Sequence, residues 1–358
     1  MWAWIIKFLP SIGREAAVFI LLNTLSAATA FAALHNVVND VNYHTFSARH
    51  PILARVKPGD VVVTKTVDSA GFDYQGVRHT KTHGNPLTGP FYIEGAEPGD
   101  AIVVQLDRIR LNRATGYTAY RVGDVDAEVG KKFSPGPYTE GAVLPGRTDL
   151  IPFIIDVKKG TARPKDQLSS LVDLSFKATP MLGCIGVAPA GDQAPTSGPA
   201  GAYGGNLDYK EIREGATVIL PVSVPGAYFF IGDGHALQGD GEAVGSGIET
   251  SLDVQFTIGL RKNAGLTEPR VENSDYLISI GARTATNRSL NDALTIANSD
   301  MMRWLIEEYK IEPIAAHLLI GHQARYDVAA LSGVIAIKIP KGVLSRRLPL
   351  VQGKRKHI

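Results

Sequence analysis

One glycine-rich segment, GDGHALQGDGE from Gly232 to Glu242, holds the side chains best suited to chemistry. An oxygen-rich set with one imidazole suits Zn²⁺ or another divalent metal ion. Glycine lets the backbone bend tightly, which would bring the side chains together. The residues alone leave a second interpretation open, a glycine-rich hairpin whose acids are solvated. The ligand-type residues in the segment are Asp233, His235, Asp240 and Glu242.

Two shorter segments add candidate polar residues. In GGNLD, Asn206 and Asp208 would lie on the same side of an extended chain, because side chains alternate along a strand. Glu249 precedes a stretch from Thr250 to Leu260 in which apolar and polar residues alternate. Counted in steps of two residues, Glu249 falls with the polar positions, so its side chain should point away from the apolar face. Taken singly, each residue is more often a turn former or a solvated acid.

The remaining candidates lie in a loop that enters a strand, HGNPLTGPFYIE, which supplies His83, Asn85 and Glu94. Other catalytic signatures are missing, since the chain has no G-x-S-x-G elbow, no HExxH and no Walker loop. Cys184 lies in the apolar stretch MLGCIGV, where burial would raise the pKa of its thiol. We therefore interpret Cys184 as a packing residue.

The elements that must position these residues are mostly strands. From Val56 to Leu260, short apolar runs alternate with turn signals, which favours an all-β sandwich or barrel. Two Pro-Gly-Asp turns, ending at Asp60 and Asp100, each lead into an extended run. The apolar residues expected on one face of the last strand are Leu252, Val254, Phe256 and Ile258.

The C-terminal part changes character. Ser289–Asp292 resembles a capping box with Asp in place of Glu, and apolar residues then recur at helical spacing as far as Leu305. Glu312-Pro313 predicts a second helix start, and Val334–Ile339 a closing strand. We therefore expect a β-rich domain followed by a smaller α+β domain.

The amino-acid composition excludes several classes of protein. Apolar residues make up 44% and charged residues 20% of the 358 residues, which excludes a disordered chain and a polytopic membrane protein. The net charge is +2, but the last 18 residues hold six basic side chains and no acid, so the rest of the chain carries −4. This balance argues against a nucleic-acid partner. The single cysteine excludes an internal disulfide and a CxxC zinc site.

The N-terminus has the order of a secretory signal. Basic Lys7 and Arg14 come before an apolar stretch, Ala16–Ala33, that ends in small residues with A-x-A patterns. We expect a cleaved signal peptide and a periplasmic or secreted protein with no stable membrane partner. An uncleaved membrane anchor is the main alternative, and a misassigned start or a buried helix is a third.

Longer motifs resemble the acetamidase/formamidase family of amide hydrolases. The resemblance extends from about His44 to Gly342, and the motifs that carry it are LTGPFYIEGAEPGD, MLGCIGVAP, the stretch Tyr203–Glu242 and GIET. It implies a jelly-roll or sandwich-like β domain with a smaller α+β domain, usually in a homo-oligomer. It further implies hydrolysis of a small aliphatic amide substrate to a carboxylate and ammonia, with a divalent metal, often zinc. Family members are typically cytoplasmic, which the signal here contradicts.

These observations predict four segments along the chain. Residues 1–32 form the signal peptide and residues 44–265 the β-rich domain that carries the site. Residues 266–342 form the α+β domain, and residues 343–358 a basic tail.

The resemblance also implies roles for single residues. Its motifs place Asn206, Asp208, Asp233, His235, Gln238, Asp240, Glu242 and Glu249 in the pocket, with Glu94 as a further acid. We assign the metal to His235, Asp233, Asp208 and Asp240. Proton transfer is assigned to Glu249 or Glu94, and carbonyl polarisation to Asn206 or a glycine N–H. Substrate binding is assigned to His83, Gln238 and Gly205. The rival hypotheses are a non-catalytic ligand-binding β domain that kept the fold and an amidase that uses Cys184.

Overall fold

The computed structural model describes residues 32–82, 84–119, 127–133, 143–166, 174–283 and 286–345. Their fold is mainly β, as the sequence predicted. The predicted signal peptide, most of the basic tail and His83 lie outside the described residues. Among the helices that the structure describes, none combines the length and apolar character needed to cross a bilayer.

The larger sheet has nine strands among the described residues and is antiparallel except at one edge, where β1 pairs in parallel with β3. Its order is β1 (Leu34–Asn36), β3 (Val61–Lys65), β15 (Leu252–Arg261), β5 (Ala101–Leu111), β13 (Thr217–Pro221), β16 (Arg270–Glu272), β17 (Tyr276–Ala282), β19 (Val334–Pro340) and β18 (Arg325–Ala330).

Two smaller sheets complete the β structure of the described ranges. The second sheet runs β11 (Ala200–Gly201), β12 (Gly204–Asn206), β10 (Met181–Val187), β14 (Phe229–His235), β4 (Leu87–Ile93) and β2 (Ala54–Val56). The third runs β6 (Thr115–Ala119), β7 (Leu150–Asp156), β8 (Thr161–Pro164) and β9 (Phe176–Lys177).

The first and second sheets enclose the main core. Phe256 of β15 packs edge-on against Phe91 of β4 and Phe229 of β14, with ring centroids 5.3 and 5.4 Å apart. Such edge-to-face pairs lie in the preferred range for aromatic rings. The predicted alternation along β15 is confirmed, because Leu252, Val254, Phe256 and Ile258 are all buried. The two sheets therefore form a sandwich.

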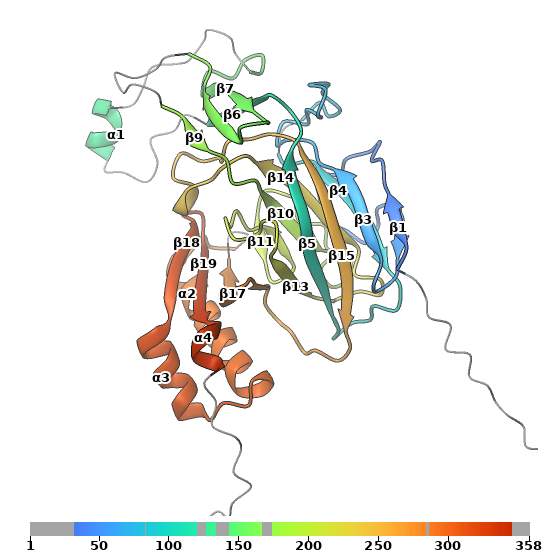
Figure 1. Cartoon of the computed structure of the whole chain (residues 1–358), viewed down its shortest axis with the longest axis vertical. Coiled ribbons are helices and arrows are strands. Elements are labelled where there is room, and N and C mark those ends of the chain that lie inside the picture. The colour runs from blue at the N-terminus through green and yellow to red at the C-terminus, as the bar shows by residue number, and fades with distance from the viewer. Residues whose placement is uncertain are drawn as a thin grey trace, which may run out of the picture. The chain divides into compact units, whose positions relative to one another are not determined.

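Helices cover the strands of the C-terminal part. The helical segments are α1 (Ala127–Phe133), the 3₁₀ turn η1 (Asp240–Glu242), α2 (Leu290–Arg303), the π-helical turn η2 (Trp304–Glu308), α3 (Pro313–Gln323) and α4 (Lys341–Leu344). Figure 1 shows α2, α3 and α4 beside β17, β18 and β19. Met301, Trp304 and Leu305 pack there against Ile337 and Ile339 in a second core.

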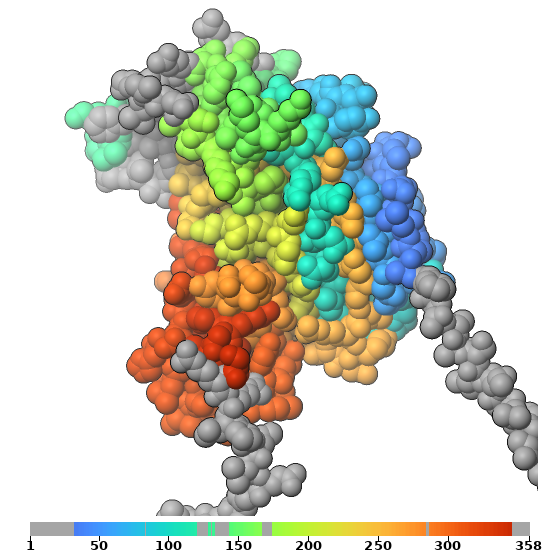
Figure 2. All heavy atoms as spheres, in the orientation of Figure 1, coloured from blue at the N-terminus to red at the C-terminus, as the bar shows by residue number. Residues whose placement is uncertain are grey.

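The predicted boundary at residue 265 falls within the nine-stranded sheet, because β16 to β19 continue the ladder that begins at β1. The described residues from Ala32 onward also belong to one compact unit. In Figure 2 the C-terminal residues, orange to red, nevertheless gather in one block on the visible face. The division into two domains stays a prediction.

The start of α2 confirms the predicted cap at Ser289. The Ser289 hydroxyl accepts a hydrogen bond from the backbone N–H of Asp292 at 3.1 Å. The second half of the predicted capping box is absent among the described contacts, since the Asp292 carboxylate accepts from Asn287 and the Ser289 N–H donates to Asn287.

We expect Ser289→Ala to lower the free energy of unfolding by about 1 kcal/mol, because the first turn of α2 loses a partner for one N–H group. Urea unfolding of the metal-free protein measures the change. Ser299→Ala is the matched control, since that hydroxyl lies mid-helix and donates to the Thr295 carbonyl. Alanine there should leave stability unchanged or slightly higher. An equal loss in both variants would contradict the capping role.

Candidate active site

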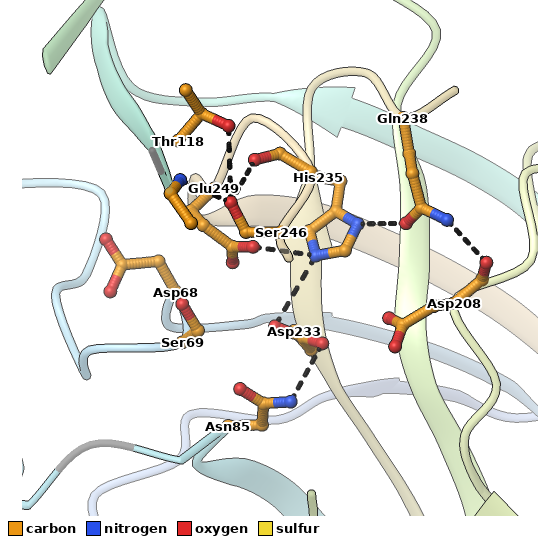
Figure 3. Close-up of polar contacts among 12 residues, drawn as sticks. Asp68, Ser69, Asn85, Thr118, Asp208, Asp233, His235, Gln238, Ser246 and Glu249 are labelled. Atoms are coloured by element: carbon orange, nitrogen blue, oxygen red, sulfur yellow. Dashed lines mark hydrogen bonds and ion pairs between the residues drawn. The ribbon is translucent and has the colours of Figure 1, made fainter. Parts of the chain in front are cut away.

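Acidic side chains from four segments meet the imidazole of His235 at the end of β14. Figure 3 shows Asp208, Asp233 and Glu249 among them. Asp233 and His235 are alternate residues of β14, so both point to one side of the strand. The His235 Nε2 atom lies 3.0 Å from Glu249 Oε1 and 3.6 Å from Asp233 Oδ1. Asp208, just after β12, and Glu242, at the end of η1, complete the cluster.

Strand register brings these segments together from distant parts of the chain. In β10, Met181 pairs with His235 and Cys184 pairs with Asn206, so β10 aligns β12 with β14. Glu249 precedes β15 and forms bridges to both His235 and Tyr117. These bridges, rather than strand alternation, set the direction of the Glu249 side chain, which is only 2% exposed.

Gln238 determines which ring nitrogen of His235 faces the acidic cluster. Its Nε2 donates to the Asp208 carbonyl at 2.5 Å, so its Oε1 faces His235 and accepts from Nδ1 at 2.8 Å. A ring nitrogen that donates in this way leaves the other nitrogen free as a ligand. Nε2 of His235 is therefore the atom available to a metal ion.

The acids crowd one another in a buried space. Burial and, after it, the neighbouring Asp233 carboxyl raise the pKa of Asp208 to about 7. Burial also raises the pKa of Asp233 to about 6, with Glu249 as the main neighbouring charge. Burial and Asp208 raise the pKa of Glu242 to about 10. Burial alone would lower the pKa of His235, but the Glu249 and Asp233 carboxylates raise it above its usual range. A bound cation would relieve this crowding.

Several buried polar atoms in the cluster have no hydrogen-bond partner. Leaving such an atom unpaired costs about 1–3 kcal/mol, so a ligand for them is expected. Ligand atoms of Asp208, Asp233 and His235 lie within 4.8 Å of one another, and the same holds for His235, Glu242 and Glu249. Nitrogen and carboxylate ligands of this kind fit a divalent metal ion. The atoms without a hydrogen bond are Asp208 Oδ1, Asp233 Oδ1, His235 Nε2 and Glu249 Oε2, although His235 Nε2 forms ion pairs with Glu249 Oε1 and Asp233 Oδ1.

The backbone around the cluster is unusual at the two aspartates. Asp208 and Asp233 have φ of 45° and 55°, a left-handed conformation that costs energy for residues other than glycine. Space for their carboxylates comes from Gly183, where a Cβ would lie 2.5 Å from Asp233 Oδ2 and 2.6 Å from Asp208 Oδ1. A Cβ at Gly247 would likewise lie 2.5 Å from His235 Nδ1.

A cavity of about 210 Å³ opens onto the cluster, and its volume suits a small substrate. Its polar lining comes from Ser69, Asn85, Tyr117, Arg147, Asn206, Asp233, Glu242, Ser246 and Glu249, and small and apolar residues complete it. A larger cavity of about 590 Å³ lies over β3 and β15 and shares none of these residues. We place the site at the smaller cavity because Asp233, Glu242 and Glu249, which belong to the buried cluster around His235, line it.

Residues 39–194 and 190–349 match the sequence profile of the Acetamidase/Formamidase family. The chain belongs to this family. It is 28% identical over 288 residues to a formamidase of Methylophilus methylotrophus, covering 64% of this chain and 69% of that one. It is 27% identical over 265 residues to an acetamidase of Mycolicibacterium smegmatis, covering 59% and 65%.

Solved structures show the same relationship. An acetamidase from Yersinia enterocolitica is 25% identical, with a TM-score of 0.72, over 89% of this chain and 95% of that one.

The chain spans 59% of the length of a Schizosaccharomyces pombe relative whose name also contains formamidase. The names of these relatives, formamidase and acetamidase, denote enzymes that hydrolyse amide C–N bonds.

Not every predicted site residue of this family member reaches the cluster. The Asp240 side chain is 54% exposed and pairs with Lys210 at 2.6 Å. Glu94 follows β4 at the end opposite Leu87 and does not line the cavity. Gly205 lies within β12, outside the lining. Gln238 is buried behind His235 and orients it, whereas His83 lies outside the described residues.

No pattern in the sequence pointed to some of the other residues that line the cavity. Tyr117 lies in the ordinary-looking strand β6, and Ser69 lies in a loop, yet their hydroxyls share a hydrogen bond at 2.8 Å. Arg147 lines the cavity while paired with Asp149 at 2.5 Å. Only the fold brings these residues to the cluster, since Glu249 bridges to Tyr117 of β6 and to His235 of β14.

Proposed function

We propose that this protein hydrolyses short aliphatic amides to a carboxylate and ammonia with a divalent metal ion, and that Zn²⁺ is the ion. The observation that carries the proposal is the set of buried, unpartnered ligand atoms on Asp208, Asp233 and His235. The family names support amide hydrolysis as the reaction, and the small cavity supports a small substrate.

Three side chains would hold the ion, Asp208 and Asp233 through carboxylate oxygens and His235 through Nε2. A divalent ion bound there supplies Lewis acidity, which polarises an amide carbonyl and makes water more acidic. The chain provides the rest of the chemistry, because an amide also needs a proton for its leaving nitrogen.

Glu249 is the residue we propose for proton transfer. It lines the cavity, and its Oε2 has no partner in the described part of the chain. A carboxylate in that position takes a proton from water at Oε2 and returns it to the leaving amine. Asp240 and Glu94, which lie elsewhere, have no part in this proposal.

The Tyr117 and Ser69 hydroxyls would orient the substrate. The pair has two hydrogens and uses one in its mutual hydrogen bond, so one remains for a substrate carbonyl. Burial and the nearby carboxylates raise the pKa of Tyr117, so its hydroxyl keeps its proton. Asn206 Nδ2 gives one of its two hydrogens to Asp208, so only the second is left for the predicted role of polarising the carbonyl.

Cys184 is disfavoured as a nucleophile. Its side chain is fully buried and does not line the cavity. Burial raises the pKa of its thiol, and the nearby Asp233 and Asp208 carboxylates raise it further, so the reactive thiolate is suppressed.

The purified full-length protein should release ammonia from formamide or acetamide and should contain a divalent metal. Removal of the metal with a chelator should abolish this activity, and Zn²⁺ should restore it. Iodoacetamide should have no effect on the native enzyme. Activity that survives complete metal removal would refute the metal chemistry, and metal binding without ammonia release from any short amide would favour the non-catalytic binding domain.

Export and assembly are further parts of the proposal. The basic, apolar and small-residue order of residues 1–32 supports a periplasmic or secreted location. A homo-oligomer is proposed from the family resemblance.

A further inference from the structure

Two asparagines contact the aspartates of the cluster in the same way. Asn206 Nδ2 donates to Asp208 Oδ2 at 2.5 Å, and Asn85 Nδ2 donates to Asp233 Oδ2 at 3.0 Å (Figure 3 shows the second contact). In both aspartates, the other oxygen, Oδ1, is buried without a hydrogen bond, and Asp233 Oδ1 lies 3.6 Å from His235 Nε2. Each carboxylate is therefore held at one oxygen by an amide, while the other oxygen faces the cluster without a hydrogen bond.

The two asparagines are also joined to each other. The second hydrogen of Asn85 Nδ2 reaches Asn206 Oδ1, at 3.0 Å. This contact comes from residues 121 positions apart in the chain, so it depends on the fold and not on local sequence. Movement of one amide would disturb both carboxylates.

The Cys184 thiol, together with Asn85 and Asp208, fixes which way the Asn206 amide faces. Because Cys184 pairs with Asn206 across β10 and β12, its Sγ lies 2.8 Å from Asn206 Oδ1. The Ser197 carbonyl, at 3.3 Å, is a more distant acceptor for the same hydrogen. A flipped Asn206 amide would place its NH₂ against two donors and its oxygen against the Asp208 carboxylate, so the observed orientation is strongly favoured.

We propose that Asn85 and Asn206 are positioning residues that orient Asp233 and Asp208 toward a divalent cation, and that Cys184 holds the Asn206 amide in its working orientation. This inference rests on the proposed metal-dependent function. It assigns Cys184 a role beyond packing and gives Asn206 a ligand-orienting role in place of the predicted contact with substrate.

The test measures the Kd for Zn²⁺ by competition with a chromophoric chelator, using the metal-free full-length protein. We expect Asn85→Ala and Asn206→Ala each to raise this Kd about 10- to 100-fold, the usual effect of losing a group that orients a metal ligand. Asn112→Ala is the matched control, because Asn112 Nδ2 also donates to an aspartate, Asp253, at 3.0 Å but outside the site. Its Kd should equal that of the wild type.

Cys184 is tested by a pair of variants. Cys184→Ala removes the donor and should weaken Zn²⁺ binding, whereas Cys184→Ser keeps a donor and should recover most of the lost affinity. Equal affinities for these two variants would overturn the role of the thiol. This pair also probes Asn206 without altering its amide, should Asn206→Ala fail to fold.

Thermal unfolding of the metal-free variants separates orientation from general damage. The positioning role predicts unfolding temperatures close to that of the wild type together with weaker Zn²⁺ binding. Wild-type Kd values in both asparagine variants would overturn the positioning role and leave the proposed function standing. A wild-type protein that binds no divalent cation would overturn both.

Discussion

Replacing His235 with alanine should release the bound metal and lower amide hydrolysis by about 10³-fold, more than the roughly 10- to 100-fold loss expected for a residue that only orients a ligand. The physical reason is that Nε2 is the one nitrogen donor in an otherwise all-oxygen cluster. Its loss leaves Asp233 and Glu249 facing each other without the imidazole between them.

The measurement combines ammonia release from acetamide with metal content after dialysis. His317→Ala is the matched control, because His317 is an exposed histidine of α3. It should retain wild-type activity and metal. Full activity in His235→Ala would show that the cluster is not the catalytic site.

Gly183→Ala is expected to have the second-largest effect. The new methyl group would lie 2.5 Å from Asp233 Oδ2 and 2.6 Å from Asp208 Oδ1, closer than Cβ atoms approach other atoms in real structures. Strand β10 cannot easily move away, because it is buried along its whole length and paired on both sides by β12 and β14. The carboxylates must therefore shift.

A displacement of about 1 Å in a catalytic group can cost about 10²-fold in rate, and we expect a loss of that size in kcat/KM for Gly183→Ala. Weaker Zn²⁺ binding should accompany it. Gly259→Ala in β15 is the matched control, since its Cβ would meet the Val103 side chain at 3.2 Å and only a small adjustment is needed. Unchanged kcat/KM and Zn²⁺ affinity in Gly183→Ala would contradict the geometry of the cluster.

Features that depend on neighbouring residues could be predicted from the sequence. The Pro-Gly-Asp turns form as expected, with the Asp60 and Asp100 carboxylates accepting from the backbone N–H groups of Lys57 and Glu97. The helix start at Pro313 follows for the same reason, because it depends on residues within one turn. The resemblance to the family motifs also allowed the acidic residues of the pocket to be proposed from the sequence.

The pairing of distant segments was decided by the tertiary structure alone. Asp233 and His235 share a strand face by spacing, so their convergence was predictable, but Asp240, five residues further on, turns outward to Lys210. Nothing in the local sequence of Asn85 or Tyr117 indicates that either lies beside Asp233 or Glu249.

The amino-acid sequence by itself determined the strands, the turns, the helix cap and the chemical types of the ligands, because these depend on side-chain alternation and on hydrogen bonds between near neighbours. Sheet register decided which acids face the imidazole, which amides hold them, and why Gly183 must lack a side chain. Those contacts join residues that lie from tens of positions to more than a hundred positions apart in the chain. They form only after the three sheets have packed around the end of β14.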